Sequence, residues 1–160
     1  MLTVKEQSEV YRLGLLIGYF KINEVIHWAD SIILIEDYPD VGVVDVSLAG
    51  GKGVNEVISQ LDNVKGKMNV SIPAKTLLGL LLRKLINHED TVFEIARKLY
   101  VLSQNISTNS LSEDLLRELI VMEDIFYIYG EESVKLKVID LLKDFEVYAD
   151  DFNSCFQSGV

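Results

Sequence analysis

The amino-acid sequence predicts an all-α protein, with about seven helices in a compact irregular bundle that forms a single helical domain over residues 1–160. Apolar residues recur at spacings of three and four along most of the chain, which is the period of helices that bury one face. Capping-box patterns precede two of these stretches. Apolar residues make up 49 % of the 160 residues, so the chain is able to bury a substantial core.

Two helices are predicted in the first part of the chain. Thr3 followed by Glu6 is a capping-box pattern, and the apolar stripe after it predicts a helix over 4–20. A second helix is expected over 22–37, where apolar residues occupy one broad face. Pro39 ends it, because proline disfavours helical geometry at the residue before it.

Residues 41–48 allow two interpretations. The four valines in this stretch favour a short strand, and an irregular helical turn is also compatible with it. The glycines within 50–53 indicate a loop. A helix is expected to follow over 54–61, and residues 62–72 have the composition of a polar linker.

The middle of the chain contains the helix that we expect to lie at the centre of the fold. Pro73 suits the first turn of a helix. The residues that follow, to about 87, are apolar nearly all round, which predicts burial on every side. Asp90 is a candidate cap for the next helix, and the polar residues 103–110 are expected to form a loop.

Two amphipathic helices are predicted in the last third. Ser110 and Glu113 form the second capping-box pattern. Gly130 separates the two apolar stripes and suits a left-handed conformation, so the helices should be antiparallel neighbours joined by a very short turn. Residues 153–160 form a tail that can fray. The two stripes consist of Leu115, Leu119, Met122, Phe126 and Tyr129, and of Val134, Val138, Leu141, Phe145, Tyr148 and Phe152.

The net charge of −10 is unevenly distributed. Residues 112–151 contain twelve acidic and four basic side chains, whereas residues 65–104 contain seven basic and three acidic ones. A strongly acidic chain lacks the Lys and Arg excess that contacts phosphates, so we expect no nucleic-acid partner. With two histidines and one cysteine in the chain, no metal and no other cofactor is expected, and a disulfide scaffold is excluded.

The N-terminus does not resemble a secretory signal, because Glu6 and Glu9 stand where basic residues would be needed. No stretch reaches the roughly 18 apolar residues of a membrane span. The lone Cys155 fits a reducing compartment. These observations predict a cytoplasmic protein without a membrane partner.

Two short patterns are similar to catalytic motifs, and both are incomplete. Ala49–Gly53 lacks the hydroxyl residue after the lysine, and the more distant glycine, of a phosphate-binding loop. His88–Glu89 would need a second histidine at Val92 to match the zinc-protease motif. His27 with Asp30 is therefore the candidate for an enzyme site, against the simpler interpretation of a histidine at the edge of the core.

An acidic and aromatic set of residues in the last third is the candidate partner-binding surface. It combines carboxylates, which attract a basic partner, with tyrosines, which are common anchors of interfaces. A solvated helical surface is the simpler alternative. The set consists of Glu118, Glu123, Asp124, Tyr127, Tyr129, Glu131 and Glu132.

Two segments resemble a known group of proteins. The residues that carry the resemblance are Trp28-Ala29-Asp30, Ile32-Ile33, Pro39 and Val44-Asp45-Val46-Ser47-Leu48-Ala49, and then Met122 to Gly130 with the helix after it. These segments, within 28–49 and 122–146, are similar to parts of small all-helical Firmicutes proteins of the immunity-protein type, found in bacterial polymorphic toxin systems. Val46 departs from that pattern, in which leucine is expected. The resemblance implies a cytoplasmic protein without enzymatic activity and carries no catalytic residues with it.

We therefore expect a non-enzymatic protein-binding protein, an immunity protein that neutralises a cognate toxin domain of basic character through its acidic surface. A structural or oligomerising adaptor is the alternative, in which a leucine strip on the helix over 75–86 packs against a second copy. An enzyme with a site near His27 and Asp30 is the third hypothesis. The chain is expected to be a monomer or a homodimer.

Overall fold

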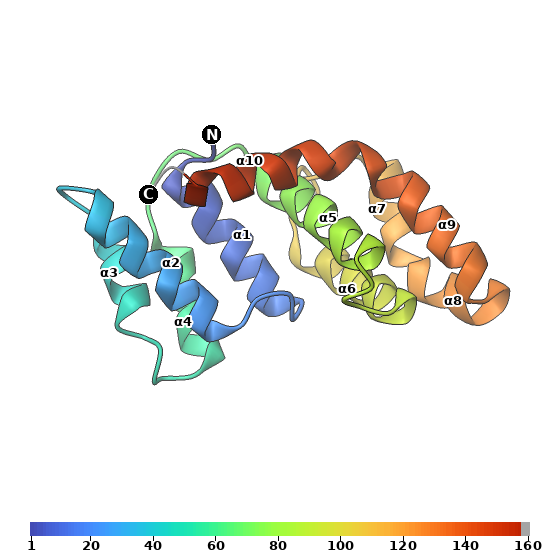
Figure 1. The fold of residues 1–160 in the computed structure, drawn as a ribbon, viewed down its shortest axis with the longest axis horizontal. Coiled ribbons are helices and arrows are strands. Elements are labelled where there is room, and N and C mark those ends of the chain that lie inside the picture. The colour runs from blue at the N-terminus through green and yellow to red at the C-terminus, as the bar shows by residue number, and fades with distance from the viewer. Residues whose placement is uncertain (158–160) are drawn as a thin grey trace.

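The computed structural model describes residues 1–157, and these residues form only helices, turns and loops (Figure 1). The predicted all-α fold class is confirmed. In chain order the elements are α1 (Val4–Leu16), α2 (Ile22–Ile35), α3 (Val41–Ser47), α4 (Val54–Asn63), α5 (Ser71–Ile86), α6 (Val92–Asn105), α7 (Glu113–Ile120), α8 (Met122–Tyr129), α9 (Glu131–Leu142), the 3₁₀ turn η1 (Lys143–Phe145) and α10 (Glu146–Gln157).

The described helices outnumber the roughly seven predicted because residues 41–47 are helical and because the two long amphipathic stripes of the last third are each divided. Val121 separates α7 from α8, and the 3₁₀ turn η1 separates α9 from α10. Apolar spacing continues across both breaks, so the stripes alone do not indicate where the axis changes direction. The structure keeps the predicted hairpin: α8 and α9 pack together, and Gly130 between them has φ +83°.

Residues 41–47 form the helix α3 and not a strand. The side chain of Asp40 accepts a hydrogen bond from the amide of Gly42 at 2.9 Å and so caps the first turn. Val43 and Val46, which are three residues apart, are both fully buried. Tertiary burial on one face therefore outweighs the strand preference of the valines.

The molecule is elongated, with α1 to α4 at one end and α6 to α9 at the other (Figure 1). The central helix α5 and the last helix α10 connect the two ends. α10 packs along α5, and the ring of its Phe152 lies 5.5 Å from that of Tyr11 on α1. The buried apolar side chains form one cluster that includes residues of both ends.

The predicted central position of α5 is confirmed, since ten of its sixteen residues are buried. Gly79 allows the backbone of η1 to approach α5 closely. A Cβ added there would lie 2.3 Å from the carbonyl oxygen of Phe145, so only glycine lets η1 rest directly on α5. The leucines of this helix lie inside the molecule, and the exposed leucine strip expected of an oligomerising adaptor is absent from it.

The same turn occurs twice in the described chain, between α1 and α2 and again between α5 and α6. Gly18 and His88 occupy equivalent positions after the first helix, with φ +75° and +56°. In each turn the amide of this residue and the amide of the next one donate to carbonyls of the preceding helix, Leu15 and Gly14 in the first turn and Leu85 and Lys84 in the second, which is the hydrogen-bond pattern of a Schellman motif. Glu24 and Glu94 then accept from the backbone amide at the start of the second helix, both at 2.7 Å.

The predicted caps are correct at one site and wrong at two. Thr3 and Glu6 form the complete capping box. Thr91, not Asp90, caps α6, and Asp90 pairs instead with Lys98. Ser112, not Ser110, caps α7. At α6 the true cap Thr91 has Glu94 three residues on and so matches the capping-box pattern better than Asp90. At α7 the pattern favours Ser110 with Glu113, although Ser112 is the cap.

The chain end is helical as far as the structure describes it. Residues 153–157 of the predicted tail belong to α10, and 158–160 lie outside the described residues. No helix among residues 1–157 has both the length and the apolar character needed to cross a membrane.

Candidate functional site

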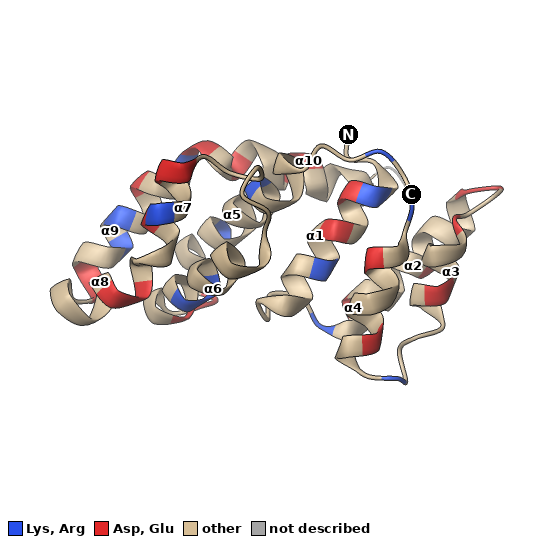
Figure 2. Ribbon diagram, turned by 180° about the vertical axis from the view of Figure 1, so that it is seen from behind, with Lys and Arg blue, Asp and Glu red and all other residues tan. Residues whose placement is uncertain are grey.

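The structure brings the predicted partner-binding residues to one end of the molecule. They come from three consecutive helices, α7, α8 and α9, and Figure 2 shows acidic segments on α7 and α8. We call the α8–α9 part of this end the α8–α9 surface. It consists of Glu123, Asp124, Tyr127, Ile128, Tyr129, Glu131 and Glu132.

Three large side chains in the last turn of α8 are exposed in succession. Tyr127, Ile128 and Tyr129 are 71 %, 70 % and 67 % exposed. The ring of Tyr127 is held by edge contacts with Phe93 and Phe126, at 5.9 and 6.0 Å between ring centres. Contiguous exposed apolar area of this kind is unusual on an isolated domain and is typical of interaction surfaces.

Tyr129 and Ile128 differ from what the sequence pattern indicated. Tyr129 continues an apolar stripe that predicts burial, yet the helix ends there and the side chain is left in solvent. The sequence does not indicate that Ile128 is exposed, because a single isoleucine next to an apolar stripe carries no signal of exposure. Leu136 of α9 is also 67 % exposed.

The carboxylates of the α8–α9 surface are free of ion pairs within the described residues. Glu123, Asp124, Glu131 and Glu132 lie in the first turns of α8 and α9, where the helix dipole favours negative charge. Glu118 differs from them, since its Oε2 lies 2.8 Å from Nζ of Lys137. It is therefore neutralised within the chain.

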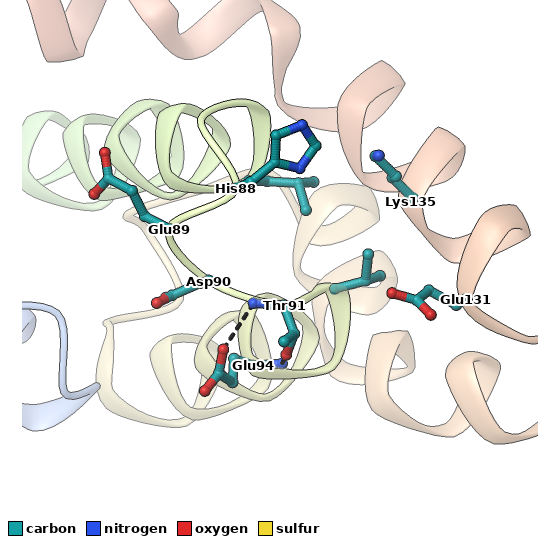
Figure 3. Close-up of a pocket in the computed structure, with 9 residues that line it drawn as sticks. His88, Glu89, Asp90, Thr91, Glu94, Glu131 and Lys135 are labelled. Atoms are coloured by element: carbon teal, nitrogen blue, oxygen red, sulfur yellow. Dashed lines mark hydrogen bonds between the residues drawn. The ribbon is translucent and has the colours of Figure 1, made fainter.

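A small pocket of about 270 Å³ adjoins this surface, where the α5–α6 turn faces α9 (Figure 3). His88 projects from the turn on the side of Lys135, while Glu131 extends from α9 toward the start of α6. Glu94 also lines the pocket, and its Oε2 accepts the hydrogen bond from the amide of Thr91. The pocket extends the acidic character of the α8–α9 surface toward α6.

The sequence pattern does not indicate His88 or Lys135 as residues of a binding site. The place of His88 directly after the leucine-rich helix could have indicated a helix-ending position. That His88 lies near Lys135 depends on how α9 packs against the α5–α6 turn, and no pattern in the local sequence indicates it. Residues 1–157 contain no group of three or more His, Cys, Asp or Glu side chains placed to hold a metal ion.

His27 and Asp30 lie together at the other end of the molecule. Both line a shallow hollow of about 500 Å³ between α2 and Gly50. His27 is exposed and makes no hydrogen bond within the described residues, whereas Asp30 accepts one from the hydroxyl of Ser47. The hollow thus holds one free imidazole and one carboxylate already engaged in linking α2 to α3.

The segment that carries the resemblance to immunity proteins has structural roles in this fold. Trp28 is buried, and its Nε1 donates to Oε1 of Gln7 at 2.9 Å. Ala29 is buried beside it, and Asp40 caps α3. Comparison with family models, curated proteins and solved structures finds no match to this chain.

Proposed function

We propose that this chain is a non-enzymatic protein-binding protein that covers a basic partner with its α8–α9 surface, in the manner of an immunity protein that neutralises a toxin domain. One observation carries the proposal. Three successive side chains, each about two-thirds exposed or more, stand beside four carboxylates that have no partner within the described residues. Aromatic anchors with a polar rim are the usual anatomy of an interface.

The charges indicate the kind of partner. The carboxylates of Glu123, Asp124, Glu131 and Glu132 would attract a surface rich in Lys and Arg and would raise its rate of association. A toxin domain that acts on nucleic acid has such a surface, because its cleft attracts phosphates. The exposed side chains from Tyr127 to Tyr129 would then supply the buried area that slows dissociation.

The first test is co-expression and co-purification with a toxin domain encoded next to this chain. A stable complex and survival of cells that carry both proteins are expected. If no complex forms and the toxin still kills cells that express this chain, the proposal is wrong.

The second test uses charge reversal in the complex. Glu123→Lys/Asp124→Lys should weaken binding by about tenfold or more at low salt, with a loss that shrinks as salt screens the charges. Calorimetry at two salt concentrations measures both effects. The matched control is Glu36→Lys/Asp37→Lys, an exposed acidic pair between α2 and α3, which should leave affinity unchanged.

The third test separates the aromatic anchor from the charges. Tyr129→Ala should weaken binding by about tenfold at any salt concentration, because its contribution is burial. Tyr38→Ala, at a side chain that is 94 % exposed on the opposite end, serves as the control. Equal affinities for the two variants would remove α8 from the interface.

A further inference from the structure

A second pocket lies between α2 and α10, at the end of the molecule opposite to the α8–α9 surface (Figure 1). Its volume is about 510 Å³, which is in the range of sites that enclose a small organic molecule. Its walls are mainly apolar: the rings of Tyr11, Trp28 and Phe156, with Leu34 and Ile35 at the exposed end of α2.

The hydroxyl of Tyr11 is the first sign that this pocket takes a ligand. The side chain is only 6 % exposed, with its ring packed against Phe20 and Trp28 at 4.6 and 5.1 Å. No group in the described residues hydrogen-bonds to the hydroxyl. The hydroxyl oxygen is not among the fully buried unpaired atoms of the described residues, so it is open to the pocket and free to accept from a ligand.

Glu24 supplies the second sign. Glu24 lines the pocket, and its Oε2 accepts a hydrogen bond from the backbone amide of Lys21 at 2.7 Å, which fixes the position of the carboxylate. Burial raises the pKa of Tyr11, and the negative charges of Glu24 and Cys155 add to the shift. Among the described residues that line the pocket there is no Lys or Arg, and His27 is the one basic side chain.

These groups together define the chemistry of the ligand. Aromatic faces and a carboxylate, with no Lys or Arg opposing them in the lining, attract a positive charge. An ammonium group has several N–H donors, enough for the Glu24 carboxylate and the Tyr11 hydroxyl oxygen at once. We propose that the α2–α10 pocket binds a small organic amine, with its ammonium group at Glu24 and Tyr11 and its apolar body against Trp28 and Phe156.

The proposal does not rest on the α8–α9 surface, and its test uses the full chain alone. Trp28 is the only tryptophan in the sequence, so its fluorescence reports on this pocket. The probe is phenethylamine, which is cationic near neutral pH. 2-Phenylethanol and phenylacetate are its neutral and anionic counterparts of similar shape.

We expect saturable change of Trp28 fluorescence with phenethylamine. The neutral alcohol should bind about tenfold more weakly and the anion more weakly still, because a partly desolvated charge interaction is worth about one decade in affinity. Equal affinities for amine and alcohol, or no saturable binding of the amine, would overturn the proposal.

Two variants assign the contacts. Glu24→Gln should lose most of the preference for the amine over the alcohol while still capping α2, since glutamine also serves in a capping box. Tyr11→Phe should weaken binding of the amine several-fold. The variant should keep the fold, because the hydroxyl has no hydrogen-bond partner within the described residues to lose. Glu94→Gln is the matched control, because Glu94 has the same capping position in α6 and lies outside this pocket. Unchanged preference in Glu24→Gln would contradict the proposed site.

Discussion

At the scale of single residues, His88 adopts a backbone conformation that its equivalent Gly18 adopts without strain. Both end a helix with positive φ, but only His88 carries a Cβ. His88→Gly should therefore stabilise the protein by about 0.5–1 kcal/mol, after the extra entropy of glycine in the unfolded chain is subtracted. Urea unfolding measures the change in the free energy of unfolding.

The reverse substitution provides the comparison. Gly18→Ala should destabilise the protein by about 1 kcal/mol through φ alone, because nothing lies within 4 Å of the added Cβ. If His88→Gly were destabilising, the imidazole would contribute packing or hydrogen bonds that outweigh the strain of its backbone.

At the scale of elements, the contact of α5 with η1 depends on one missing side chain. A Cβ on Gly79 would meet the backbone oxygen of Phe145 at 2.3 Å and the Cβ of Ala149 at 3.1 Å. A backbone atom cannot rotate away, so α10 would have to shift along its whole length. Gly79→Ala should cost about 2–3 kcal/mol of stability, as overpacked cores do.

The control for this prediction is Gly51→Ala, at an exposed position with open space around the added Cβ. Its stability should stay within about 0.5 kcal/mol of the wild-type value. Thermal unfolding followed by circular dichroism compares both variants. Equal melting temperatures for Gly79→Ala and Gly51→Ala would contradict the prediction, because they would show that η1 and α10 move to accept the added Cβ at little cost.

At the scale of the whole molecule, the fold keeps two tyrosines un-ionised to high pH. Burial raises the pKa of Tyr19 to about 12, with the charges of Glu89, Glu24 and Asp90 adding to the shift, and burial also raises the pKa of Tyr11. Between the unfolded pKa near 10 and the folded pKa, the unfolded chain holds fewer protons than the folded one. Stability is therefore complete below about pH 10 and falls as pH rises through this window.

Alkaline titration of stability checks the prediction. Each tyrosine should contribute about 1.4 kcal/mol of loss per pH unit in this window. The double variant Tyr11→Phe/Tyr19→Phe keeps both rings and removes both protons, so its stability should fall less steeply. Lysine deprotonation affects both proteins alike, and parallel curves would contradict the role of the tyrosines.

The whole molecule also separates two surfaces of different chemistry. The α8–α9 surface is acidic and aromatic, and the α2–α10 pocket is mainly apolar, with Glu24 and His27 in its lining. They lie at opposite ends of an elongated fold (Figure 1). Binding of an amine at the α2–α10 pocket and binding of a protein at the α8–α9 surface can therefore be tested independently of each other.

By itself, the sequence determined what depends on local spacing. The helical period predicted an all-α fold, the leucine-rich run predicted the buried helix α5, and Thr3 with Glu6 predicted the first cap. The charge of the last third also predicted the acidic helices. These features follow from residues a few positions apart, whose interactions do not require the rest of the chain.

Only the tertiary structure decided the features that depend on residues far apart in the chain. The apolar period continues across Val121 and across η1, so the breaks there come from packing against α5 and α6. The α2–α10 pocket joins Glu24 to Phe156, and the exposure of Tyr129 depends on where α8 ends. Hydrophobic burial is non-directional, so the spacing of apolar residues predicts that a face is buried but not which element covers it.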